Sequence, residues 1–176
     1  LGTTDADRKN CRAAWEAWWQ QEANKLDLAA IDWQKRTLGY TLACLCFGKD
    51  GDKVIELGPD GKVRWEITGL HHPRDAQVLP GQRVLIAEYG KERGRGRATE
   101  RAIGGKITWE FQFKARDGRG GGGVVACQRL TNGNTFLASF DGWLCELTPD
   151  KKEIYQFAPS IDGKDFHHVR KLRNGD

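Results

Sequence analysis

The sequence predicts an all-β fold behind one N-terminal helical segment, and three observations carry this prediction. From Leu38 onward, apolar and polar residues alternate in short runs rich in β-branched and aromatic side chains. Turn-forming pairs such as Asn132-Gly133 and Asp141-Gly142 separate these runs. Related units also recur at steps of 44 and 46 residues, a spacing typical of β-propeller blades. We therefore expect an incomplete β-propeller, with about two full four-stranded blades plus partial blades.

Residues 1–37 carry the expected helical segment. Thr4 or Asp5 can cap a helix that runs to about Asn24. Its apolar positions fall on one stripe, formed by Cys11, Trp15, Trp18, Trp19 and Ala23. Residues 26–33 keep a spacing that is compatible with a further turn or two. Because three tryptophans on one stripe need a cover, we expect this segment to cap a sheet edge.

Residues 38–176 form the partial propeller in this prediction. The expected strands are 40–47, 53–57, 62–68, 75–79, 83–88, 99–103, 106–113, 124–130, 135–140, 143–147, 152–157 and 166–172. They make two full blades between a partial blade and the lone last strand. Closed rings use about four to eight blades, so missing blades or self-association must cover the open edges. The chain starts at Leu1 and contains no Met, which indicates a fragment.

One unit of the strands is repeated three times. A glutamate, a turn and an aromatic residue follow one another as Glu56 and Trp65, Glu100 and Trp109, and Glu146 and Tyr155. We therefore expect Trp65, Trp109 and Tyr155 to occupy equivalent positions in successive blades. A second signature relates residues 76–87 to residues 127–138, and a third copy of it begins at His168.

These repeats resemble those of a known superfamily. Residues 60–65 and 104–109 resemble the tryptophan-docking repeat of pyrroloquinoline-quinone-like, or WD-like, β-propeller proteins. The resemblance implies that the Gly makes the turn and that the Trp packs between blades. Residues 77–81 and 129–138 resemble a strand turn that this superfamily shares with arylsulfotransferase-type propellers. Residues 14–19 resemble the closing helix of a HEAT-repeat array, which implies a helical solenoid before the propeller.

The histidines are the catalytic candidates. The chain has four, in the pairs His71-His72 and His167-His168. Resemblance to arylsulfotransferases implies a propeller histidine as nucleophile, which would be His167 or His168. The pairs are out of register, because His167 lies five residues before Leu172 and His71 lies eight before Leu79. Loop or channel-lining histidines therefore remain the other interpretation, with His71 and His72 as ligand-binding candidates.

Further ligand-binding candidates are charged. The segment 91–97 alternates Arg and Gly, and Arg93, Arg95 and Arg97 could contact phosphate or sulfate oxygens from a flexible loop. No aromatic residues interleave with them, so a solvated hairpin is the other interpretation and nucleic acid is not a favoured partner. Asp75 is the only acid at an inner strand. One carboxylate does not hold calcium, so the sequence assigns no metal and no cofactor for a quinoprotein dehydrogenase.

Composition limits the remaining choices. Net charge is +4, although residues 91–129 hold ten basic against four acidic residues. No apolar run is long enough to span a membrane, and no motif indicates a compartment. The five cysteines lack zinc spacing and are interpreted as packing residues. We therefore expect a non-enzymatic binding or scaffolding module that engages a protein or small ligand through its channel or loops. Sulfuryl transfer and quinoprotein chemistry are the alternatives.

Overall fold

The computed structural model describes residues 5–27, 39–90, 95–114, 122–157 and 166–172. The chain divides into two compact units, residues 1–38 and residues 39–176. In the first unit, helix α1 (Asp5–Glu22) continues into a 3-10 turn, η1 (Ala23–Lys25). Leu26 and Asp27 that follow are not helical, and the rest of the predicted segment 26–33 lies outside the described residues.

The tryptophan stripe of α1 lies at the surface. Trp15, Trp18 and Trp19 are 65%, 43% and 48% exposed. Trp15 and Trp18 contact each other edge to face, with ring centroids 5.4 Å apart. The predicted HEAT-like array and the predicted capping role remain predictions, because one helix tests neither.

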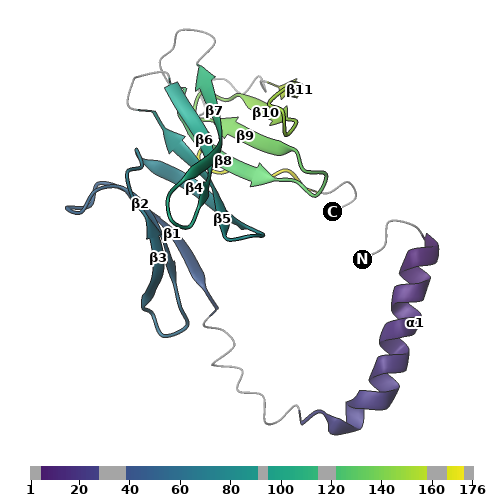
Figure 1. The fold of residues 1–176 in the computed structure, drawn as a ribbon. Helices are drawn as coiled ribbons and strands as arrows, with labels where there is room; N and C mark the ends of the chain where they lie inside the picture. The colour runs from purple at the N-terminus through teal and green to yellow at the C-terminus, as the bar shows by residue number, and fades with distance from the viewer. Residues whose placement is uncertain (1–4, 28–38, 91–94, 115–121, 158–165, 173–176) are drawn as a thin grey trace. The chain divides into compact units, whose positions relative to one another are not determined.

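The second unit is built from antiparallel sheets. Its strands are β1 (Thr41–Leu45), β2 (Lys53–Leu57), β3 (Val63–Ile67), β4 (Pro73–Leu79), β5 (Arg83–Tyr89), β6 (Arg95–Ala102), β7 (Ile107–Lys114), β8 (Val124–Arg129), β9 (Thr135–Ser139), β10 (Leu144–Leu147) and β11 (Glu153–Phe157). They form one three-stranded sheet, β1-β2-β3, and two four-stranded sheets, β4-β5-β6-β7 and β8-β9-β10-β11 (Figure 1). Each sheet is a meander, as in a propeller blade. The described part of the unit is therefore all-β and an incomplete β-propeller.

The faces of neighbouring sheets pack against each other. One core cluster joins the second and third sheets through Leu85, Ala98, Cys127 and Leu137, with Trp109 and Phe111 packed on its side. Another cluster joins the first and second sheets through Val54, Ile67, Val84 and Ile86, with Trp65 at its side. Burial of these side chains between sheets, at about 25 cal/mol per Å², is the main stabilisation of such an arrangement.

The turn after the repeat glutamate is the same in all three sheets. Gly61, Gly105 and Lys151 each donate a backbone hydrogen bond three residues back, at 2.8–2.9 Å. All three have positive φ, at 75°, 87° and 69°. A glycine adopts this conformation without steric cost, whereas Lys151 carries a Cβ in a region that disfavours it.

One predicted strand is absent and the bounds of others differ: β1 ends at Leu45 rather than Phe47, and β4 begins at Pro73 rather than Asp75. Strand β6 begins at Arg95 rather than Thr99, because β5 and β7 pair with it on both sides over that stretch. Residues 166–172 form no strand. They lie beside β8, where the side chain of Gln128 bonds both the N–H and the C=O of Lys171, at 2.9 and 3.3 Å. A strand requires a backbone ladder, and side-chain bonds from β8 do not supply one.

Candidate functional site

Strands β4 and β8 are each the first strand of their sheet in the sequence, and we call them the inner strands. The end of the sheets at which these two strands begin is called the start face. The described residues whose rings contact one another here include Phe47, His71, His72, Tyr89, Phe140 and His167. Backbone bonds join the connections at this end: Tyr89 N donates to His72 O (3.2 Å), and Phe140 N donates to Gly123 O (2.8 Å). Five of the six residues predicted as ligand-binding lie here or nearby: His71 and His72 before β4, Asp75 in β4, and Arg95 and Arg97 in β6.

A single carboxylate organises the first part of the start face. Asp52 accepts the backbone N–H of Phe47 at 2.9 Å through Oδ1 and that of His72 at 2.6 Å through Oδ2. The bond from His72, followed by that from Phe47, holds the pKa of Asp52 below its ordinary value. Phe47 and His72 have positive φ, at 62° and 44°, so Asp52 stabilises two strained residues at once.

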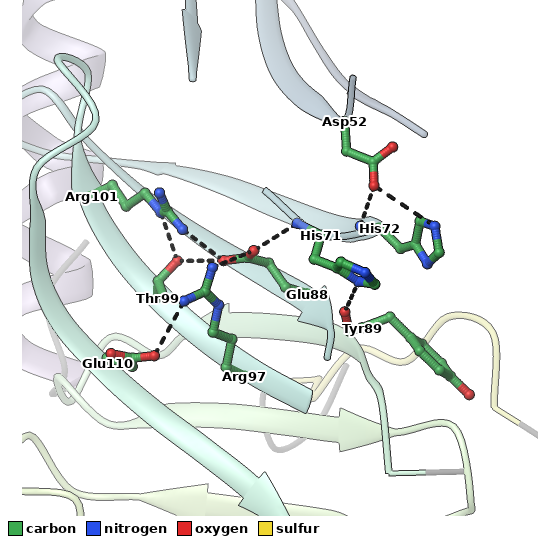
Figure 2. A network of polar contacts seen from close by, with 9 residues as sticks. All are labelled: Asp52, His71, His72, Glu88, Tyr89, Arg97, Thr99, Arg101 and Glu110. Atoms are coloured by element: carbon green, nitrogen blue, oxygen red, sulfur yellow. Dashed lines mark hydrogen bonds and ion pairs between the residues drawn. The ribbon is translucent and has the colours of Figure 1, made fainter. Parts of the chain in front are cut away.

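Phe47 is thereby held out into solvent. Its side chain is 75% exposed. The ring rests on His72, with centroids 4.4 Å apart, and His72 in turn contacts His71 at 4.5 Å. Figure 2 shows Asp52 above the two histidines and the bond of His71 Nδ1 to Tyr89 O, 2.7 Å long. An exposed aromatic ring on a braced backbone is the kind of group that anchors protein partners.

The row of rings continues into the third sheet. Tyr89 contacts Phe140 edge to face at 6.0 Å, and Phe140 contacts His167 at 5.7 Å. A Cβ built on Gly123 would lie 2.0 Å from the ring of Tyr89, so only glycine permits this approach. His167 and His168 are both exposed. Their role as a sulfuryl-transferring nucleophile stays a prediction, because residues 158–165 and 173–176 on either side of this segment lie outside the described ranges.

Arg97 belongs to the interior rather than to a loop. It donates to Glu88 at 2.9 Å and lies 3.5 Å from Glu110 (Figure 2). Glu88 is fully buried and also accepts from Arg101, Thr99 and the N–H of His71. Buried carboxylates are stable when every oxygen is hydrogen-bonded, and this one is. The expectation of a flexible cationic loop is therefore wrong for 95–97; Arg95 lies exposed in β6, and Arg93 lies outside the described residues.

Asp75 is engaged within the chain. Arg170 binds it in bidentate fashion, at 2.6 and 2.8 Å, and the N–H of Cys127 donates to it at 2.8 Å. The carboxylate therefore links the inner strands β4 and β8 to the segment 166–172. Within the described ranges, no three His, Cys, Asp or Glu side chains gather so that they could hold a metal ion.

The repeated glutamates link neighbouring sheets. In every sheet the glutamate pairs across strands with the aromatic residue: Glu56 with Trp65, Glu100 with Trp109, and Glu146 with Tyr155. Arg129 from the next sheet bonds Glu100 at 2.8 Å and stacks on Trp109, at 5.7 Å. In the same way, Lys171 bonds the carboxylate of Glu146 and lies over the ring of Tyr155. Trp109 and Tyr155 thus share one kind of inter-blade contact, whereas Glu56 is bonded within its own sheet by Arg64 and by the indole N–H of Trp65. The equivalence of all three aromatic positions stays a prediction.

The opposite end of the inner strands carries a groove of about 500 Å³. Its lining includes Gln77, Gln128, Arg129, Glu146 and Lys171. Since Arg129 and Lys171 are already paired with glutamates, the groove presents few uncommitted charges.

Sequence reasoning missed Phe47, Asp52 and Arg74. Phe47-Gly48 and Asp52 stand in a short polar connection whose only signal is a large apolar residue at a turn. Arg74 lies in a β-bulge of β4, between the paired residues Pro73 and Asp75. A bulge turns one side chain away from the alternating pattern, and no residue type in the sequence marks it.

Comparison with known proteins gives only distant similarity. No protein-family model and no curated protein matches the chain. A solved protein of unknown function from Bacteroides caccae is 18% identical over 60% of this chain and 38% of its own, with a TM-score of 0.45. BBS1N, solved in complex with ARL6DN, is 13% identical over 67% of this chain and 38% of its own, with a TM-score of 0.40. The chain thus spans less than two fifths of the length of either protein. In the described ranges, no helix is long and apolar enough to cross a bilayer.

Proposed function

We propose that this chain is a non-enzymatic, protein-binding part of a β-propeller, and that Phe47 on the start face is its anchor. The observation that carries the proposal is the braced exposure of Phe47. Phe47 is 75% exposed, although Asp52 holds its backbone N–H and its ring contacts His72. A large apolar side chain that is rigid before binding loses little conformational entropy in a complex.

The surrounding groups support binding rather than catalysis. Glu88 is paired with Arg97 and Arg101, and Asp75 is paired with Arg170. His167 and His168 are exposed at the end of the row of rings. The repeated glutamate–aromatic unit supports the finer proposal that the blades are of the pyrroloquinoline-quinone-like type.

Affinity capture from an extract of the source cells tests this proposal. The bait is the full chain, and its variants are Phe47→Ala and, as matched control, Val63→Ala. Val63 is a 54% exposed residue at the start of β3, at the other end of the first sheet. Capture is followed by titration with the purified partner.

We expect Phe47→Ala to weaken binding by about 30-fold, a loss of about 2 kcal/mol, as for a central aromatic anchor. Val63→Ala should leave binding unchanged. A chain that captures no partner, or one that binds Phe47→Ala as tightly as wild type, would contradict the proposal. Turnover of an aryl sulfate by the wild-type chain would also contradict it.

A further inference from the structure

The start face carries an exposed cation close to Phe47. Arg74 lies in the bulge at the start of β4, between Pro73 and Asp75, and its side chain is exposed. Its guanidinium lies over the ring of Tyr89, 5.6 Å from the centroid. The bulge turns Arg74 away from the buried face that Pro73 and Asp75 share, and Tyr89 holds it there.

Arg74 and Phe47 belong to one small region. Cys46, the neighbour of Phe47, donates its thiol to Pro73 O at 3.0 Å. The charges of Asp52 and Arg74 both act on the Cys46 thiol. Burial and then Asp52 raise the pKa of this thiol, and Arg74 lowers it. Phe47, Asp52 and Arg74 thus surround the same two residues, Cys46 and Pro73.

Among the described residues, neither Asp52 nor Glu88 forms an ion pair with Arg74. Both oxygens of Asp52 accept backbone N–H groups, from Phe47 and His72. Glu88 is fully buried and engaged by Arg97 and Arg101. A guanidinium that stacks on a ring by one face keeps its N–H edges directed outward, where they can bind a carboxylate in bidentate fashion.

We propose that the partner of the start face is a protein segment in which a carboxylate stands beside an apolar side chain. The apolar side chain packs on Phe47, and the carboxylate binds Arg74. This inference rests on the proposed function and deepens it, because it specifies what the anchor selects. Charge complementarity at an exposed arginine helps to select the partner, because a segment without the carboxylate gains nothing from Arg74.

A displayed library of random peptides tests the inference without knowledge of the natural partner. Peptides are selected on the wild-type chain and depleted on Phe47→Ala. Binders that survive should carry Asp or Glu next to an aromatic or aliphatic residue. Absence of any Phe47-dependent peptide would overturn the proposed function itself. Phe47-dependent peptides that are neutral or basic would overturn only the present inference.

Substitutions at Arg74 give the quantitative arm, with one selected peptide as probe. Arg74→Ala should weaken its binding about tenfold, and Arg74→Lys should recover part of the loss, because an ammonium keeps the charge without the fork. Replacing the peptide's acid by its amide should remove the difference between wild type and Arg74→Ala. Equal affinities for wild type and Arg74→Ala, with circular dichroism confirming that both are folded, would overturn the inference.

Discussion

Glu100 is the residue whose replacement best measures the contact between the second and third sheets. Its side chain is 6% exposed. It accepts Arg83 at 2.6 Å, Arg129 at 2.8 Å and the hydroxyl of Thr108 at 3.2 Å. The isosteric change Glu100→Gln keeps the shape of the side chain, removes its charge and turns an amide N–H toward a guanidinium.

The expected cost follows from what the substitution leaves behind. Arg83 is 44% exposed and regains water, but Arg129 is only 20% exposed and its Nε–H already has no acceptor. Removing one member of a buried pair costs about 3–5 kcal/mol. Because one of the two cations is resolvated, we expect the lower end, about 3 kcal/mol of unfolding free energy.

Urea unfolding followed by circular dichroism measures this loss. With a slope of about 2 kcal/mol per M, the midpoint should fall by about 1.5 M. The matched control is Glu66→Gln, where the carboxylate is 47% exposed and 3.2 Å from Lys53. Its cost should stay below about 1 kcal/mol. If Glu100→Gln costs no more than Glu66→Gln, the glutamate does not join the sheets in the way described.

Three further predictions concern the turn, an acid group and the thiols. Lys151→Gly should raise the free energy of unfolding by about 0.5–1 kcal/mol, because φ of Lys151 is 69°, where glycine is favoured. The control Lys152→Gly should lower it. Equal effects of the two variants in urea unfolding would show that the backbone of Lys151 is not strained. The hydrogen bond from Lys171, then that from Asn134, holds the pKa of Glu146 below its ordinary value. The ionised Glu146 therefore stabilises the folded chain fully above about pH 4.3, and this contribution is lost as the pH falls through the lowered pKa. Glu146→Gln should therefore flatten the fall of the urea midpoint between pH 5 and 3, and parallel curves would refute this. Burial is the largest cause that raises the pKa of the Cys44 thiol to about 12, followed by the nearby Asp75 and Cys46. Burial also raises the pKa of the Cys127 thiol well above its usual range. Iodoacetamide at pH 8 should therefore modify these two thiols only after unfolding, as peptide mapping would show, whereas rapid labelling of the native chain would contradict their burial.

The repeat could be read from the sequence because it depends on local patterns. The same spacing separates a glutamate, a turn and an aromatic residue in three places, at Glu56, Glu100 and Glu146. This repeated spacing is enough to predict three similar antiparallel sheets. The same turn residues, among them Gly61 and Gly105, mark where the strands reverse. The alternation of apolar and polar residues and the choice of turn residues depend on short segments of the sequence, so they predict strands and turns without knowledge of distant contacts.

The start face could not be read in this way, because its contacts join distant residues. Arg97 looks like part of a flexible loop until Glu88, nine residues earlier, is seen to be buried beside it. Asp52 and His72 are 20 residues apart, and Arg170 reaches Asp75 across 95 residues. The segment 166–172 shows the opposite error, because its apolar pattern fits a strand while the described residues offer it no ladder.

The claim on which the functional account depends is that a partner binds over Phe47 at the start face. Hydrogen exchange of the chain with and without a selected peptide tests it most directly, because it maps the contact along the whole sequence. We expect added protection at residues 46–52, 71–75 and 89–90, with no change at the groove residues 128–132. Protection at 128–132 with none at 46–52 would show that binding occurs at the other end of the sheets and would contradict the account.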